Sequence, residues 1–368
     1  MNEIRRFARV VLTLVLPIAG IACGQPEEGT ATGGIGAEVP DLAEPAGAGT
    51  PITVTGRVTE FALPPPPSGG PSFYPGMITV GRDQDLWFRT SLAELGHMSR
   101  NGRRVAFVPI PSIGIGLANG IALGADGHIW FGTAAGIARL NHNGTSDEFP
   151  LSDRTSAPQD VVAGRDGNLW ALGYNFVHRV TTAGVITSFP LPTSTLSSGN
   201  HMTNGPDGNV WFTDGRDRLL LRVTPAGVIT AFPAGPGGQL FGIAGGHDGH
   251  IWFTRQGGGA GDNAIARMTI DGVVSTVVQL PDSTTTPPNP PGGMPMVITA
   301  GDDRAMYYTT YFEQPLNYIG RVTPAGHLTK FIIPSPGAAS FGITSDREGD
   351  IWFTENFNNI IGRLRTRR

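Results

Sequence analysis

Cysteine and lysine are almost absent from this chain of 368 residues, because Cys23 and Lys330 are the only ones. A single cysteine excludes any disulfide within the chain. Charged residues make up only 15% of the sequence, and the net charge is −4 with no basic run. This balance argues against nucleic-acid binding. The apolar run Val10–Ala22 is too short to span a membrane.

The first 22 residues have the features of an export signal. Three arginines within the first nine residues precede the apolar run, and this order predicts a signal peptide over residues 1–22. The stretch Gly20–Cys23 (GIAC) resembles a bacterial lipobox, in which the cysteine is lipidated and becomes the first residue of the mature protein. The alternative is an ordinary cleaved signal followed by an incidental cysteine.

We therefore expect Cys23 to be a lipid anchor and the only contact with a membrane. The protein would be a bacterial envelope lipoprotein at the outer membrane or cell surface, or otherwise periplasmic or secreted. Gly24–Thr50 consists mainly of Gly, Ala, Pro and Glu, and such a segment buries too little apolar surface to fold. Residues 23–50 are thus a predicted flexible tether, and residues 51–368 a predicted folded domain.

Glycine and proline are abundant, with 53 and 31 residues, which favours short strands joined by tight turns. One aromatic position recurs seven times, at spacings of 43, 40, 41, 41, 55 and 45 residues. A period in the low forties is typical of a propeller blade of four strands. The position is filled by all six tryptophans and one tyrosine: Trp87, Trp130, Trp170, Trp211, Trp252, Tyr307 and Trp352.

Each unit repeats the same order, as in GPDGNVWFTD at Gly205–Asp214. An Asp-Gly turn of the hairpin type leads into the aromatic strand, and two further strands follow. No fourth strand follows Arg363, whereas Gly56–Pro64 reads as a fourth strand with no unit before it. We therefore predict an all-β fold, a monomeric seven-bladed β-propeller of four-stranded blades. The N-terminal strand closes the ring in the last blade, and the aromatic residues fill the space between blades.

From about Gly56 to Arg365 the chain resembles the virginiamycin B lyase family, also called streptogramin lyases. The resemblance rests on the DGxxWFTE-like turn and strand, the IGR third strand at Ile319–Arg321 and Ile361–Arg363, and the GxITxF fourth strand. It implies a seven-bladed propeller that linearises a cyclic depsipeptide antibiotic by elimination across an ester-type C–O bond. It also implies a general base and a divalent cation, usually magnesium, at one mouth of the central channel.

The resemblance further implies two histidines in Pro-His-x-Ile motifs at the start of the innermost strands of the last two blades. These motifs fall on Pro295–Ile298 and Ser340–Ile343, so that Met296 and Phe341 stand in place of the histidines. Neither side chain accepts a proton. We therefore expect the family reaction not to proceed with the family residues.

Two acidic positions are implied as well. The first falls on Ala339, and the second falls on Asn356, with Glu355 one place before it. Glu355 is therefore the single catalytic candidate, and magnesium is expected only if the lyase activity holds. No histidine pair has metal-ligand spacing on one strand, so the histidines are not expected to cluster and no metal ligand is predicted.

Two rings of residues are expected at the same mouth, where innermost strands begin and aromatic strands end. The first ring holds Gly76, Asn119, Gln159, Asn200, Phe241, Met296 and Phe341. The second ring holds Thr90, Thr133, Gly173, Asp214, Arg255, Thr310 and Glu355. An apolar wall with a few charges suits a small ligand or peptide, although a solvated rim without a ligand is the alternative. The candidate ligand-binding residues are Asn119, Asn200, Asp214, Arg255, Tyr311 and Glu355.

Three functions remain open from the sequence. The first is binding of a small molecule, a peptide or an envelope protein at the channel mouth. The second is catalysis, as a C–O lyase of the streptogramin type or another hydrolase, using Glu355 and Asp214. The third is a structural scaffold in the cell envelope.

Overall fold

The structure is a computed structural model that describes residues 57–65, 74–110, 120–151, 158–192, 200–257, 261–280, 293–311 and 317–366. These residues form 28 strands in seven antiparallel four-stranded sheets. None of them forms a helix of the length and apolarity needed to cross a membrane. The predicted signal peptide, Cys23 and the predicted tether lie outside the described residues.

The sheets follow one another along the chain as blades. Blade 1 consists of β2 (Ile78–Val80), β3 (Leu86–Arg89), β4 (Glu94–Met98) and β5 (Val105–Pro109). Blade 2 consists of β6 (Ile121–Leu123), β7 (Ile129–Gly132), β8 (Gly136–Leu140) and β9 (Ser146–Pro150). Blade 3 consists of β10 (Asp160–Ala163), β11 (Leu169–Leu172), β12 (Phe176–Val180) and β13 (Ile186–Pro190). Blade 4 consists of β14 (Met202–Asn204), β15 (Val210–Asp214), β16 (Leu219–Val223) and β17 (Ile229–Pro233).

The last three blades complete the ring. Blade 5 consists of β18 (Gln239–Gly245), β19 (His250–Gln256), β20 (Ala264–Thr269) and β21 (Val274–Gln279). Blade 6 consists of β22 (Met294–Ala300), β23 (Met306–Tyr311), β24 (Tyr318–Val322) and β25 (Leu328–Ile332). Blade 7 consists of β26 (Ser340–Ser345), β27 (Ile351–Glu355), β28 (Ile360–Arg365) and the N-terminal strand β1 (Arg57–Ala62).

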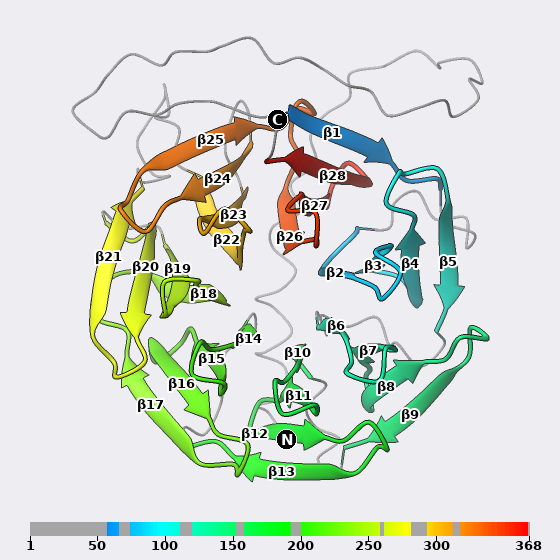
Figure 1. Cartoon of the computed structure of the whole chain (residues 1–368), viewed down its shortest axis with the longest axis horizontal. Helices are drawn as coiled ribbons and strands as arrows, with labels where there is room; N and C mark the ends of the chain where they lie inside the picture. The colour runs from blue at the N-terminus through cyan, green and yellow to red at the C-terminus, as the bar shows by residue number, and fades with distance from the viewer. Residues whose placement is uncertain are drawn as a thin grey trace, which may run out of the picture. The chain divides into compact units, whose positions relative to one another are not determined.

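The seven blades surround a central axis that is lined by the first strand of each blade (Figure 1). Each of these innermost strands contacts that of the next blade, and β26 of blade 7 contacts β2 of blade 1. The strand β1 pairs antiparallel with β28, with Arg57 opposite Arg365. Both the seven-bladed propeller and its closure by the N-terminal strand are therefore confirmed.

The repeated aromatic residues lie between blades, as predicted. Trp352 of blade 7, for example, belongs to the core cluster of blade 1 together with Phe88. The turn aspartate holds the indole in place, because Trp352 Nε1 donates a hydrogen bond of 2.8 Å to Asp346. In the equivalent turn of blade 4, which also precedes the aromatic strand, Gly208 has a φ of 81°, a conformation that glycine adopts without steric cost.

A second repeated contact ties neighbouring blades together at one end of the aromatic strand. A buried threonine there donates its hydroxyl to a backbone carbonyl on the innermost segment of the next blade. These buried or partly buried bonds help to hold the start of the innermost strand in four blades. The pairs are Thr213 to Phe241 (3.1 Å), Thr254 to Met296 (2.7 Å), Thr309 to Phe341 (2.9 Å) and Thr354 to Gly76 (3.0 Å).

Candidate functional site

Three innermost strands are irregular at the mouth where the sequence placed the site. In blades 5, 6 and 7 the pairing with the aromatic strand shifts by a β-bulge just where the innermost strand begins. A bulge turns a side chain away from its regular direction and is common beside functional sites. The bulges lie between Leu240 and Ile243, between Pro295 and Ile298, and between Ser340 and Ile343.

The bulged segments supply the apolar floor of the mouth. The rings of Phe241 and Phe341 meet edge to face, with centroids 6.1 Å apart. Met296 lies on the blade between them and is only 8% exposed. The two positions where the resemblance implies histidines thus carry apolar side chains, and a proton acceptor is missing from both.

An aromatic cluster forms the rim above blades 6, 7 and 1. The ring of Phe357 lies 5.8 Å from that of Tyr74 and 6.0 Å from that of Tyr311. Tyr74 and Phe357 are 43% and 51% exposed, which is unusual for large aromatic side chains. Burial, with a smaller contribution from Tyr74, raises the pKa of the Tyr311 phenol. Of these three residues only Tyr311 was predicted from the sequence, since Tyr74 and Phe357 stand in loops outside the strand repeat.

A buried polar network forms the wall on blades 3 and 4. Asp160 accepts hydrogen bonds from the backbone of Met202 (2.8 Å) and from His201 Nδ1 (3.3 Å). The ring of His201 lies 4.8 Å from that of Phe241, so the network reaches the apolar floor. Asp160 was missed because the candidate positions were counted one residue earlier, at Gln159.

Asn200 belongs to the same wall and is buried. Its Nδ2 lies 3.4 Å from Gln159 Oε1, and its Oδ1 accepts the backbone N–H of Gly215 at 2.9 Å. The predicted neighbour Asn119 lies outside the described residues.

Two of the three charged residues predicted on the second ring, Asp214 and Arg255, are held by hydrogen bonds to neighbouring groups. Asp214 is buried and accepts the backbone N–H groups of Arg216 (3.1 Å) and Asp217 (3.3 Å). Arg255 donates to Thr276 at 3.2 Å and to the backbone carbonyl of Ala234, which follows the last strand of blade 4, and burial lowers the pKa of its guanidinium. These contacts account for both side chains structurally, and ligand binding by either stays a prediction.

Glu355 is buried where β27 ends. Burial raises the pKa of its carboxyl to about 8, and the nearby Glu60 of β1 adds to this effect. Asn358 Nδ2 donates to Oε2 at 3.4 Å, whereas Oε1 has no hydrogen-bond partner among the described residues. A buried carboxyl that keeps its proton near neutral pH has the property expected of a general acid or base.

A polar cavity of about 540 Å³ opens at the same mouth between blades 4 and 5. It lies next to the turns that follow Asp214 and Arg255. Its polar lining comes from Arg216, Arg218, Gln239, Gln256 and Asp262.

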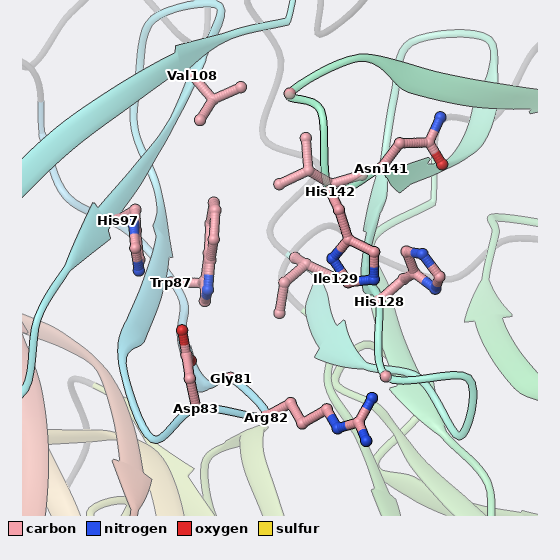
Figure 2. A pocket seen from close by; sticks show the side chains of 13 residues that line it. Gly81, Arg82, Asp83, Trp87, His97, Val108, His128, Ile129, Asn141 and His142 are labelled. Atoms are coloured by element: carbon pink, nitrogen blue, oxygen red, sulfur yellow. The ribbon is translucent and has the colours of Figure 1, made fainter.

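At the opposite mouth, the expectation that the histidines do not cluster is wrong for three of them. His97, His128 and His142 line one cavity of about 620 Å³ between blades 1 and 2 (Figure 2). The histidines come from a third strand and two different turns, and only the stacking of blades brings them together. Side-chain ligand atoms of Asp83, Asp85 and His97 also lie within 4.8 Å of one another. That spacing is compatible with one metal ion, and no metal ligand was predicted from the sequence.

The model of the virginiamycin B lyase family matches residues 46–198 and 194–368. The chain belongs to this family. Virginiamycin B lyase from Nocardia farcinica is 26% identical over 219 residues, which span 58% of this chain and 67% of that protein. The resemblance deduced from the sequence motifs is therefore confirmed.

Solved virginiamycin B lyases have the same propeller. The selenomethionine-substituted enzyme from Staphylococcus aureus is 27% identical and has a TM-score of 0.70, with 83% of this chain and 98% of that chain covered. A catalytically inactive variant of the Staphylococcus aureus enzyme, solved with quinupristin, is 27% identical and has a TM-score of 0.69 at the same coverage.

Proposed function

We propose that this protein is an exported binding protein of the virginiamycin B lyase family, with its ligand held at the mouth formed by blades 5, 6, 7 and 1. The observation that carries the proposal is the contact of Phe341 with Phe241 beside Met296. The floor of the mouth is apolar where the family reaction needs a base. Loss of the base with retention of the propeller favours binding over turnover.

The surroundings of this floor favour an apolar ligand that carries aromatic groups. The exposed rings of Tyr74 and Phe357 offer stacking surfaces, and such contacts contribute about 0.5–1.5 kcal/mol each beyond burial. The Asp160–His201 pair on the opposite wall can orient a polar group of the ligand. A cyclic peptide related to quinupristin, which is present in the structure of the Staphylococcus aureus relative, fits this description.

Calorimetric titration of the purified chain with quinupristin tests the proposal. Saturable binding is expected, weakened roughly tenfold in Phe357→Ala because one stacking surface is lost. Val228→Ala is the control, since Val228 is 61% exposed but lies in a turn of the opposite mouth. Equal affinities of Phe357→Ala and the unchanged chain would place the ligand elsewhere and refute the proposed mouth.

Catalysis is the second candidate function, and Glu355 favours it. Its raised pKa, near 8, lets the carboxyl accept and return a proton around neutral pH. In this alternative Glu355 assists a C–O elimination or a hydrolysis at the mouth, with magnesium as the cation. Turnover that disappears in Glu355→Gln, with quinupristin affinity unchanged, would establish it.

Export and anchoring belong to the proposal as well. They rest on the residue pattern of the predicted signal peptide and on Cys23 after GIA. Labelling of bacterial cells with a palmitate analogue should mark the chain and leave Cys23→Ser unmarked. A Cys23→Ser chain labelled as strongly as the parent would contradict the anchor.

A further inference from the structure

In five of the seven blades, a phenylalanine of the outermost strand stacks on the repeated aromatic residue. This ring also fills the space in front of the next blade. In four of the five blades, a methyl group added to the turn glycine of that next blade would collide with the ring. The stacked pairs are Phe61 with Trp352 (5.7 Å), Phe149 with Trp130 (5.3 Å), Phe189 with Trp170 (5.9 Å), Phe232 with Trp211 (5.2 Å) and Phe331 with Tyr307 (6.5 Å).

Blade 1 lacks this phenylalanine. Its register places Val108 opposite Leu95, as Phe149 stands opposite Ile137 in blade 2. Trp87 is accordingly only half-buried, whereas the other five tryptophans are buried. A methyl group added to the turn glycine of blade 2, Gly144, would meet no atom within 4 Å. The missing ring therefore leaves an open slot.

Blade 5 also has a valine at this position, Val278 opposite Ile265, yet no slot opens there. A β-bulge in β21 brings the neighbouring Val277 against the same core cluster. Trp252 of that blade is buried within this cluster. The slot in blade 1 thus results from a missing ring without a compensating bulge.

The cavity of about 620 Å³ at the slot has one aromatic wall and one imidazole wall. The face of Trp87 away from the cavity is backed by His97, with ring centroids 4.3 Å apart and planes 14° apart. On the opposite side, Figure 2 shows His128, His142 and Ile129. The ring centroids of His128 and His142 lie 4.6 Å apart. The space between the walls suits a flat ring stacked on the indole, as phenylalanine rings stack in the other blades.

Residues of opposite charge, Asp83 and Arg82, lie at the lower end of the cavity in Figure 2, with the Asp83 side chain beneath Trp87 and the Arg82 guanidinium on the side of His128. Arg82 lines the cavity and has no ion-pair partner among the described residues. The adjacent Asp83 carboxylate accepts one hydrogen bond, from the backbone of Asp85 at 3.2 Å. The carboxylate of Asp85 is occupied by His97 at 3.1 Å and by the backbone of Arg100 at 3.2 Å. A guanidinium and a carboxylate are thus available to a ligand that carries both charges.

We propose that the cavity between blades 1 and 2 binds a free aromatic amino acid. The ring stacks on Trp87 in the place of the missing phenylalanine. The ligand carboxylate pairs with Arg82, and the ligand ammonium pairs with Asp83. This site lies at the mouth opposite the one used in the proposed function, so either can fail without affecting the other.

The first test is titration calorimetry of the purified chain with L-phenylalanine, in the presence of EDTA to keep the Asp83–Asp85–His97 group free of metal. Saturable binding is expected. Affinities at least about fivefold lower are expected for 3-phenylpropionate, which lacks the ammonium, for phenethylamine, which lacks the carboxylate, and for L-leucine, which lacks the ring. No saturation with L-phenylalanine up to about 10 mM, a Kd that corresponds to less than about 4 kcal/mol of binding free energy, would overturn the proposal. Saturation only when metal replaces EDTA would overturn it as well.

Variants locate the site. Val108→Phe restores the ring found in five other blades, so the chain should fold and binding should fall at least about tenfold. Arg82→Gln should weaken binding of L-phenylalanine and 3-phenylpropionate but leave that of phenethylamine unchanged. Asp83→Asn should weaken binding of L-phenylalanine and phenethylamine but leave that of 3-phenylpropionate unchanged. Arg165→Gln is the matched control, because Gly164–Asp166 repeats the sequence of Gly81–Asp83 in blade 3. Unchanged affinity in a folded Val108→Phe chain would overturn the site.

Discussion

Phe341 of blade 7 and Phe241 of blade 5 touch edge to face across the blade that separates them. The contact depends on the bulges that turn both side chains toward the mouth. Partly buried hydrogen bonds from Thr213 and Thr309 hold the backbones of both phenylalanines. Phe341 thus stands where the sequence resemblance implies the second histidine, and Met296 stands where it implies the base.

The carboxyl of Glu355 predicts how stability changes with pH. Its pKa is about 8 in the folded chain against an ordinary 4.5, so between these values the folded state binds more protons. The free energy of unfolding therefore falls as pH rises, by up to about 1.4 kcal/mol per pH unit. Glu355→Gln should match the parent near pH 4.5 and exceed it near pH 8.5, as measured by urea unfolding.

Glu148→Gln is the control for this measurement, because Glu148 is an exposed glutamate of blade 2. Parallel stability curves for the parent and Glu355→Gln over this pH range would show that the carboxyl titrates normally.

The missing phenylalanine of blade 1 predicts stability changes of opposite sign in two blades. Val108→Phe fills a cavity and should stabilise the chain by about 0.5–2 kcal/mol. Phe189→Val removes the ring stacked on Trp170 and should cost about 2 kcal/mol, because it leaves a comparable cavity. Thermal unfolding measures both. A destabilised Val108→Phe chain would mean that the slot does not have the shape of a phenyl ring.

The contact between blades 7 and 1 predicts that the chain loses stability when the hydroxyl of Thr354 is removed. Thr354 Oγ1 donates to Gly76 at 3.0 Å and accepts the backbone N–H of Gly342 at 2.9 Å. Thr354→Val removes the hydroxyl partner of one buried and one partly buried backbone group and should destabilise the chain by about 1–3 kcal/mol. Thr145→Val, in an exposed turn, should cost less than about 1 kcal/mol. Equal urea midpoints for Thr354→Val and Thr145→Val would show that the hydrogen bonds of Thr354 do not stabilise the contact between blades 7 and 1.

The fold could be predicted from the sequence because one aromatic position repeats at nearly constant spacing. The strand β1 could be placed as well, since Gly56–Pro64 repeats the pattern of a fourth strand. The directions of site side chains could not. Asp214 and Arg255 occupy equivalent positions of the repeat, yet Asp214 accepts from its own turn, whereas Arg255 donates to Ala234 beyond the last strand of blade 4.

The cavity of blade 1 illustrates a further limit. The valine at position 108 is visible in VAFVP beside ITSFP of blade 3. Its consequence depends on the register with Leu95 and on the glycine of the next blade. Blade 5 has a valine at the same position, but a β-bulge brings Val277 into the space of the missing ring. The pattern of residue types does not reveal this bulge.

The most direct test of the central claim is incubation of the purified chain with quinupristin and magnesium, followed by liquid chromatography and mass spectrometry. Elimination leaves the mass unchanged, so the linear product would be recognised by its shifted retention. The account predicts saturable binding and no linear product, even at high protein concentration, because Met296 and Phe341 cannot accept a proton. Accumulation of the linear product would contradict it and would make Glu355 the first residue to replace.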